Sequence, residues 1–384
     1  MFFKCSHLSF ILYSPKGMRR MNKVLAIVVT YNRLEMLKQC VEHLQAQTFP
    51  CDILIVDNAS TDGTRVWATS LNSKEARSLM RGQSSRITQV MDPDDEVLVA
   101  ERTKKRSRPK VVPVDVMTQD TVIRTATVLW DDDSMHRIIY ENTGENLGGA
   151  GGFNYGMRRA VEMGYEFAWV MDDDAFAEAD CLEKLMQAAG QIQEFGFLTS
   201  AVMWKDGSLC RMNYQRKYPT PKVRSERHLL ESDLDKGLVQ IQSATFVSAL
   251  FPTKIIRKVG LPIKEFFIWC DDIEFTRRIT LKYHYPAYVV TSSRITHYIQ
   301  NNAGTNIALD DVDRIPRHNY AFRNENYMYR QYGLKGFAYY LVVIAYNTFQ
   351  ILAHAPSHKG ARLKVVWKNL FTGLSFNPKI EKVR

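Results

Sequence analysis

The sequence predicts an α/β fold, in which a mostly parallel sheet is flanked by helices and carries an insertion and a helical C-terminal region. Three observations support this fold class. The runs VLAIVVT at 24–30 and DILIVD at 52–57 are rich in β-branched residues and typical of strands buried on both faces. Leucine and valine recur between them at three- and four-residue spacing, which predicts an amphipathic helix. This alternation of strand and helix indicates βαβ units and therefore parallel strands.

Polar residues follow each predicted strand directly. Thr30, Tyr31 and Asn32 end the first strand, and Asp57 and Asn58 end the second. Ligands of open α/β sheets bind at the carboxyl ends of the strands. We therefore expect these side chains to line one binding site.

A further apolar run at 167–171 leads straight into the Asp triplet 172–174. Burying an unpaired carboxylate is costly, so such a cluster persists where a cation lies against it; the alternative is a solvated turn. A second triplet, 131–133, also follows an apolar run, and the local pattern does not separate the two. Chain order favours 172–174, which follows a glycine-rich turn at 148–152 and its helix. That turn can present a helix N-terminus to phosphate, although its spacing matches neither the dinucleotide fingerprint nor a Walker loop.

The composition is that of a soluble globular protein with an anionic partner. The 384 residues suffice for one large domain with additions or for two domains, and 45% apolar residues exclude disorder of the whole chain. The net charge of +10 favours a nucleic acid, an acidic membrane face or a phosphorylated substrate. The cysteines lack a CxxC pair, which indicates reduced thiols in a cytoplasmic protein. They are Cys5, Cys40, Cys51, Cys181, Cys210 and Cys270.

Two segments stand outside the α/β pattern. Residues 1–21 form an N-terminal extension whose short apolar patch does not match a signal peptide, and Met18 or Met21 could serve as the start. Residues 73–128 look like an insertion in the sheet, and we expect a solvated, partly disordered loop there. Its basic run lacks interleaved aromatic residues, which disfavours nucleic acid as a partner.

Five stretches together resemble the inverting family-2 glycosyltransferases of the GT-A fold, whose sheet is Rossmann-like. They are VVTYNR, IVDNASTDGT, NLGGAGGFNYGM, VMDDDAF and FFIWCDDIEFTRRI. With the later His297, the pattern is most similar to the branch of galactofuranosyltransferases and rhamnosyltransferases. The likeness covers residues 22–330 apart from the insertion, and we expect a GT-A domain at 22–310.

The resemblance implies a sugar-nucleotide site and a metal site. Asp172, Asp174 and His297 are the implied ligands of Mn²⁺ or Mg²⁺, because hard oxygen ligands suit both ions and imidazole tolerates manganese better. Asp57 is expected to accept a hydrogen bond from the base. The full set of expected substrate-binding residues is Thr30, Tyr31, Asn32, Arg33, Asp57, Asn58, Asn146, Gly148, Gly149, Asp172, Asp173 and Trp269.

The stretch WCDD supplies the second carboxylate pair. We expect Asp272 to be the base that takes the proton from the acceptor hydroxyl, with Asp271 orienting the acceptor or supporting the base. The alternative is that both residues only begin the helix that follows, where acidic residues are favoured. Trp269 is expected to stack on a sugar ring, the alternative being core packing.

The C-terminal region, 311–384, is predicted to be helical and basic. Its apolar stretch 337–355 is about as long as a membrane span, but its second half carries Asn347, Gln350 and His354. A helix packed on the core or lying in the membrane interface is therefore favoured over a span. Lys359, Arg362, Lys364 and Lys368 are expected to form a basic flank for an anionic membrane surface.

The expected function is transfer of galactofuranose from UDP-galactofuranose to a saccharide or glycolipid acceptor, at the inner face of the plasma membrane. The nearest alternative is a rhamnosyltransferase or another hexosyltransferase using dTDP-rhamnose or a different sugar nucleotide. A nucleotidyltransferase would leave the WCDD stretch without a role, and a non-catalytic binding module would not need Asp172, Asp174 and Asp272 intact. The sequence leaves the acceptor and the oligomeric state open, a homo-oligomer being one alternative.

Overall fold

A computed structural model describes residues 23–70, 137–218 and 227–383, together with five short strands between 86 and 129. The predicted N-terminal extension, most of the 73–128 insertion, the Asp triplet 131–133 and Cys5 lie outside the described residues. Cys40, Cys181, Cys210 and Cys270 are free thiols, as predicted.

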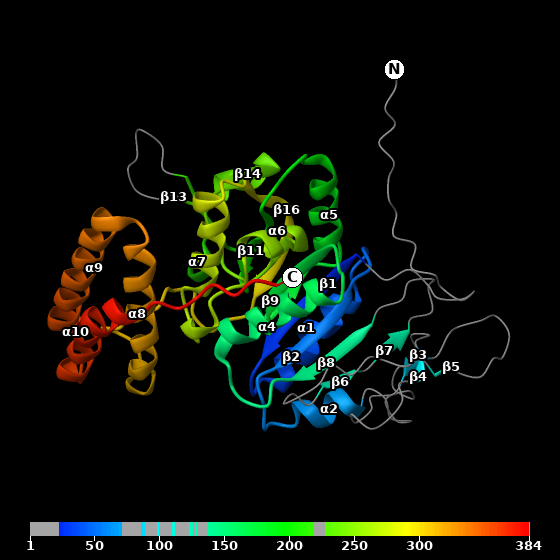
Figure 1. The fold of residues 1–384 in the computed structure, drawn as a ribbon, viewed down its shortest axis with the longest axis horizontal. Helices are drawn as coiled ribbons and strands as arrows, with labels where there is room; N and C mark the ends of the chain where they lie inside the picture. Colours follow the sequence, from blue (N-terminus) through cyan, green and yellow to red (C-terminus); the bar gives the residue numbers. More distant parts are fainter. Residues whose placement is uncertain are drawn as a thin grey trace, which may run out of the picture.

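The described residues form one large sheet flanked by helices, which confirms the predicted fold class (Figure 1). Four parallel strands make its centre, and antiparallel β15 joins them to a second parallel pair, β11 and β16. The central strands are β8 (Ile138–Asn142), β2 (Asp52–Asp57), β1 (Val24–Thr30) and β9 (Phe167–Asp172). The outer strands are β15 (Ala249–Pro252), β11 (Phe197–Trp204), β16 (Ala287–His297), β10 (Ala175–Ala177) and β14 (Leu238–Ile241), with β6 (Ile123–Thr125) beside β8.

The other short strands of the region predicted as an insertion pair among themselves. β3 (Arg86–Thr88) pairs with β7 (Thr127–Leu129), and β4 (Leu98–Val99) pairs with β5 (Lys110–Val111). The main sheet therefore continues into this region only through β6, as far as the described residues show.

Alternate residues of β1 enter two cores, one on each face of the sheet. Leu25, Ile27 and Val29 pack with α4, whereas Val24, Ala26 and Val28 pack with α1 and α5. Full burial of such a side chain contributes roughly 1.5–3 kcal/mol. The helices of this part are α1 (Leu34–Gln45), α2 (Thr64–Ser70), α4 (Gly148–Glu162), α5 (Cys181–Gln191), α6 (Thr253–Val259) and α7 (Asp271–Arg277).

Helix α4 approaches β1 closely because two of its glycines face the strand. A Cβ atom on Gly152 would lie 2.4 Å from Val29, and one on Gly156 would lie 2.4 Å from Ile27. Neither neighbour can move away, since both belong to the buried strand. Part of the glycine-rich segment therefore serves helix–strand packing.

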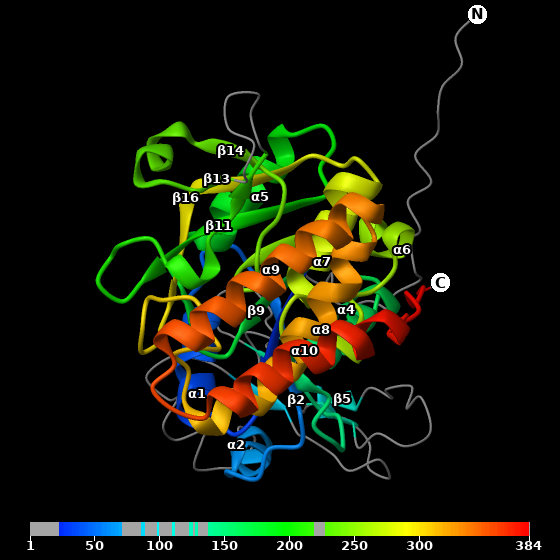
Figure 2. The ribbon, with the colours of Figure 1, turned by 90° about the vertical axis from the view of Figure 1, so that its left-hand side faces the viewer.

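The C-terminal region contains three long helices that pack on one side of the sheet domain (Figures 1 and 2). They are α8 (His318–Arg330), α9 (Gly333–His354) and α10 (Lys359–Ser375). The end of the chain returns to the sheet domain, where Glu381 pairs with Arg158 and Lys264. The three helices are thus attached to the sheet domain at both ends.

Helix α9 presents most of its apolar surface outward. Its buried residues are Gly336, Tyr340, Ile344 and Ile351, which form one stripe along the helix. Among the described residues it is the helix long and apolar enough to cross a membrane by length and composition, with a hydropathy of 1.3 over a window that is 22% buried. Large apolar side chains such as Val342, Tyr346 and Phe349 are therefore exposed along this helix.

The prediction of a basic flank is wrong for one of its four residues, Arg362. Arg362 is 1% exposed, and its guanidinium donates to the backbone oxygens of Ser357, Ile307 and Asp310. It fastens α10 to residues 307–310 and to the turn before the helix, so it is not available to lipid headgroups. Lys359, Lys364 and Lys368 are exposed as predicted.

Candidate active site

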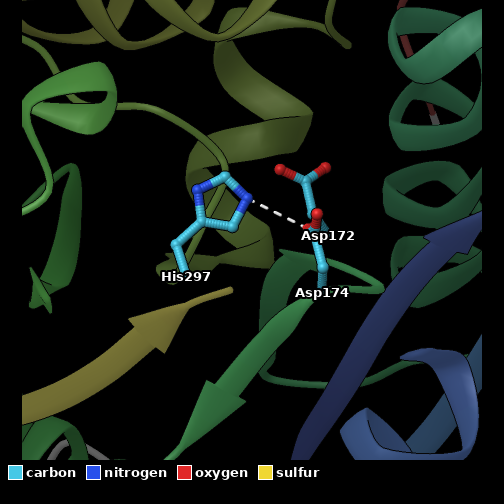
Figure 3. Close-up of side chains that lie close together, drawn as sticks. All are labelled: Asp172, Asp174 and His297. Atoms are coloured by element: carbon cyan, nitrogen blue, oxygen red, sulfur yellow. Dashed lines mark hydrogen bonds and ion pairs between the residues drawn. The ribbon is translucent and has the colours of Figure 1, made fainter. Parts of the chain in front are cut away.

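The Asp triplet lies at the end of β9, opposite the end of β16. The antiparallel pairing of β10 with β16 sets Ala175 across from His297, and this register brings the imidazole to the triplet. Ligand atoms of Asp172, Asp174 and His297 all lie within 4.8 Å of one another (Figure 3). The structure therefore gathers the three predicted metal ligands into one cluster.

Residues at the end of β1 neutralise part of this charge. Arg33 Nη1 lies 3.1 Å from Asp173 Oδ1 and 2.6 Å from Asp174 Oδ2. Thr30 Oγ1 donates to Asp173 Oδ2 at 2.7 Å. Asp173, between the two ligand aspartates, is thus bound to the protein itself.

Asp172 differs from its neighbours, because its carboxylate accepts no hydrogen bond from any described residue. Burial and the nearby charge of Asp174 raise the pKa of Asp172 to about 7. For Asp174, burial opposes the charge, but the hydrogen bond from His297 and the charge of Arg33 lower its pKa. A half-buried carboxylate that accepts no hydrogen bond and lies beside a second carboxylate favours a cation.

Asn213, which the sequence analysis did not identify, orients the imidazole of His297. Its Oδ1 lies 2.7 Å from His297 Nδ1, and Asp174 Oδ1 lies 3.0 Å from Nε2. Burial works against a charged ring, but the hydrogen bond with Asp174 raises the pKa of His297 to about 10. With Nδ1–H donating to an amide oxygen, Nε2 is the atom left to ligate a metal. The donor set and its orientation fit a divalent cation.

The predicted base-binding residue Asp57 is fully buried at the end of β2. Its Oδ1 accepts from the Ser60 backbone N–H at 2.9 Å, and its Oδ2 accepts from the Tyr140 hydroxyl at 2.6 Å. Asn58 donates through Nδ2 to Gly148 O at 3.0 Å, and its buried Oδ1 has no hydrogen-bond partner among the described residues. The contact of either residue with a nucleotide stays a prediction.

The loop after β1 is hydrogen-bonded to the loop after β2. Asn32 has φ +53° and its Oδ1 accepts from the Thr61 backbone N–H at 2.7 Å. Tyr31 beside it is 45% exposed, so its ring is accessible to a ligand. Arg33, described above, completes the predicted set from this loop.

The glycine-rich turn packs against the loop that carries the second acid pair. Asn146 Oδ1 accepts from Gly148 N at 2.9 Å, and Gly148 has φ +68°. A Cβ atom on Gly148 would lie 2.0 Å from Phe267 O, which also accepts from Ala150 N at 3.1 Å. Gly149 has no such neighbour. The turn and the acid-pair loop therefore form one unit.

The acid-pair loop, which we define as residues 266–270, has an unusual backbone. Phe267, Trp269 and Cys270 have φ values of +63°, +67° and +69°. Side chains other than glycine rarely adopt this conformation, which is retained mostly at functional sites. The loop delivers Asp271 and Asp272 into the first turn of α7.

Both carboxyl groups of the acid pair have raised pKa values. Burial and the charge of Asp272 raise the pKa of Asp271 well above its ordinary value, with Asp172 contributing. Burial raises the pKa of Asp272 to about 6, although its Oδ1 accepts from Ile273 N at 2.7 Å. The charge of Asp172 in the first acidic cluster thus contributes to the raised pKa of Asp271 in the second.

Trp269 packs against α8. Its ring centroid lies 5.1 Å from that of His318, and its side chain is half-buried. Phe267 stacks on Tyr320 of the same helix at 4.8 Å. Phe266, the third aromatic residue of the acid-pair loop, lies 5.8 Å from Tyr327 of α8, measured between ring centroids. All three thus contact the C-terminal helices, and stacking of Trp269 on a sugar stays a prediction.

The chain matches the profile of Glycosyl transferase family 2 over residues 25–88 and 126–257, which is about half of its 384 residues. The interruption falls inside the region predicted as an insertion. The match includes Thr30, Asp57, the glycine turn and the Asp triplet, but ends before the acid pair.

Galactofuranosyltransferases GlfT1 of two mycobacteria are similar to the chain. The protein of Mycolicibacterium smegmatis is 24% identical over 216 residues, covering 51% of this chain and 67% of that protein. The protein of Mycobacterium tuberculosis H37Rv is 25% identical over 191 residues, covering 46% and 62%. The chain thus spans only about two thirds of the length of these relatives.

Solved structures give remote likenesses. The mannosyltransferase PcManGT of Pyrobaculum calidifontis, in complex with GDP-Man and Mn²⁺, has a TM-score of 0.44 and 14% identity over 93% of this chain and 76% of its own. TarS residues 1–349 of S. aureus with UDP has a TM-score of 0.42 and 13% identity over 92% and 72%. These scores add nothing to the sequence match. On the profile match, supported by the order of the site elements, the chain belongs to glycosyl transferase family 2, and galactofuranosyltransferases are among its relatives.

Proposed function

We propose that the protein is a metal-dependent, inverting galactofuranosyltransferase that uses UDP-galactofuranose and a lipid-linked saccharide acceptor. The observation that carries the proposal is the pairing of two acidic clusters at one site. One contains Asp172 and Asp174 beside His297, and the other contains Asp271 and Asp272. The similarity to mycobacterial galactofuranosyltransferases supports the choice of donor.

In this proposal the Asp triplet holds the cation that binds the diphosphate of the sugar nucleotide. A divalent cation held by Asp172, Asp174 and His297 would supply positive charge to the departing diphosphate. Arg33, whose side chain is half exposed, lies where it can contribute a second positive charge. The buried Oδ1 of Asn58, which lacks a partner among the described residues, accepts a hydrogen bond from the sugar nucleotide in this proposal.

Asp272 acts as the base. It accepts the proton of the acceptor hydroxyl while the oxygen forms a bond to the anomeric carbon, and the bond from that carbon to the diphosphate breaks to release UDP. A carboxylate whose pKa is about 6 is deprotonated at neutral pH yet basic enough for this task. Asp271, which holds its proton more tightly, is suited to donating a hydrogen bond to Asp272 or to the acceptor.

A donor screen tests the proposal. Purified full-length protein is incubated with UDP-galactofuranose, dTDP-rhamnose and other sugar nucleotides, with Mn²⁺, with Mg²⁺ and with EDTA, and nucleotide release is measured. We expect metal-dependent release from UDP-galactofuranose alone. Release from dTDP-rhamnose instead would make the protein a rhamnosyltransferase, and no release from any donor would contradict catalysis.

We also propose that the protein is cytoplasmic and binds the inner face of the plasma membrane through α9 and α10. Both helices expose large apolar side chains, which include Leu334, Val342, Tyr346, Phe349, Leu352, Trp367 and Phe371. A groove of about 410 Å³ between the two helices is lined by further apolar residues. The exposed Lys359, Lys364 and Lys368 beside this surface favour anionic lipids.

Vesicle sedimentation tests the membrane surface. We expect binding to vesicles that contain phosphatidylglycerol, weakened by high salt because surface attraction is screened within about 8 Å at physiological ionic strength. The double variant Val342→Asn, Phe349→Asn should bind at least about tenfold more weakly, since it removes two apolar contacts. Val66→Asn, equally exposed on α2, is the control. Equal binding by both variants would contradict the assignment.

A further inference from the structure

We propose that Asn324 is a positioning residue for the transfer reaction: its side-chain amide holds the acid-pair loop in the conformation that presents Asp271 and Asp272 to the acceptor. The inference rests on the proposed function, because it takes the acid pair as the acceptor side of the site. It makes α8 part of the catalytic unit, whereas the sequence assigned the C-terminal helices only a membrane role.

The contacts of Asn324 converge on the loop. Its Nδ2 lies 3.0 Å from Phe266 O, 3.2 Å from Ile268 O and 3.0 Å from Trp269 O. The side chain is fully buried. Because the loop belongs to no strand or regular helix, its carbonyls depend on partners of this kind. The amide nitrogen has two hydrogens, so at least one of them is shared between two of these three carbonyls of the five-residue loop.

Arg323 fixes the orientation of that amide. Its Nε and Nη2 lie 3.1 Å and 2.9 Å from Asn324 Oδ1, and its Nη2 also donates to Glu265 O at 2.6 Å. A guanidinium has only donors, so the amide oxygen must face it and the amide nitrogen must face the loop. The guanidinium itself stacks 4.0 Å from the ring centroid of Phe376.

The loop needs such a clamp because of its backbone. Three of its residues other than glycine have positive φ, and residues in this region persist only where surrounding groups over-determine them. Loss of the amide would let the loop relax and carry Asp271 and Asp272 with it, since they follow Cys270 directly. The carboxyl groups must be placed accurately to act on an acceptor hydroxyl.

Asn326, two residues further along α8, offers a matched control. It is also fully buried, and its Oδ1 accepts from Arg330 Nε at 3.0 Å. Its Nδ2, however, donates to Asn369 O and Leu370 O, at 3.3 Å and 2.9 Å. It therefore has the same chemistry as Asn324 but binds α10 instead of the acid-pair loop.

The test compares Asn324→Ala with Asn326→Ala in the full chain, by amide hydrogen exchange and by steady-state kinetics. For Asn324→Ala we expect faster exchange in residues 265–273 and a loss in kcat for transfer of about 10²-fold, the size expected for a 1 Å misplacement. The KM for the donor should stay unchanged, because the Asp triplet is untouched. Asn326→Ala should leave both loop exchange and kcat near their wild-type values while lowering the melting temperature.

Equal losses of kcat in the two variants, at similar melting temperatures, would show a merely structural role and overturn the proposal. Should Asn324→Ala not fold, Arg323→Lys replaces it, since it keeps the charge but removes the fork that orients the amide. Unchanged loop exchange and kcat in that variant would also overturn it. If the wild type transfers no sugar, the proposed function fails, while the exchange experiment still decides whether Asn324 clamps the loop.

Discussion

Asp174 and Asp272 belong to two acidic clusters with opposite electrostatic surroundings. Asp174 is held between Arg33 and His297, which lower its pKa and keep it charged. Asp272 lies in the first turn of α7, directly after the acid-pair loop with its positive φ values, and burial raises its pKa to about 6. The comparison teaches that the number of carboxylates says little about a cluster's task. In the first cluster Asp174 keeps its charge although the pKa of Asp172 beside it is raised to about 7, whereas in the second cluster both carboxyl groups have raised pKa values.

The largest expected effect comes from the metal side. Asp174→Ala should lower transfer by at least about 10³-fold, because it removes a ligand and leaves the charges of Arg33 and His297 without their partner. EDTA should inactivate the wild type, and Mn²⁺ should restore it. Nucleotide release measured with and without chelator checks both. Full activity in EDTA would contradict the metal-holding role of this cluster.

Asp272→Asn should reduce transfer by about 10²–10⁴-fold, the usual contribution of a general base. Asparagine keeps the shape and the oxygen that accepts from Ile273 N, so stability should change little. Binding of UDP with metal, measured by calorimetry, should be unaffected. Asp271→Asn serves as the comparison. If that variant is the inactive one, the roles within the pair are reversed, and if both turn over normally the pair only begins a helix.

The pH profile separates the two clusters further. The base must be unprotonated, and burial raises the pKa of Asp272 to about 6, so kcat should be constant above that pH and fall as pH drops through it. At saturating metal, the decline should approach about tenfold per pH unit. In Asp272→Asn the residual kcat should no longer fall as the pH drops through about 6. An unchanged limb in the variant would assign it to another group.

The smallest effect concerns the contact between the glycine turn and the acid-pair loop. Gly148→Ala should lower stability by about 1–3 kcal/mol, because its Cβ would overlap Phe267 O and its φ is +68°. Gly190→Ala in α5 is the control, since no atom lies within 4 Å of its Cβ position. That change should stabilise the protein by roughly 0.5–1 kcal/mol. Urea unfolding measures both.

The features that sequence predicts well are local ones. Strand periodicity and the polar residues at strand ends fixed the places of Thr30, Asp57 and Asp172 at one edge of the sheet. His297 was expected beside the triplet only from the family resemblance, and the register of β10 on β16, which brings it there, was not predicted.

The features that sequence misses depend on tertiary contacts. Asn213 and Asn324 lie in stretches without a motif, and only packing brings their amides to His297 and to the acid-pair loop. Arg362 was counted as a surface charge because composition does not reveal burial. The glycine turn was predicted to present a helix N-terminus to phosphate. The Cβ positions of Gly148 and Gly152 show that close packing already requires glycine there.

The return of the chain end to the sheet domain has a mechanical consequence. Glu381 is fastened by Arg158 and Lys264, and its backbone oxygen accepts from Leu261 N at 2.8 Å. Because α8 is hydrogen-bonded to the acid-pair loop, the three-helix region is attached to the sheet domain at both of its ends. A displacement of α8 would therefore act on the loop before Asp271, which α8 contacts through Asn324.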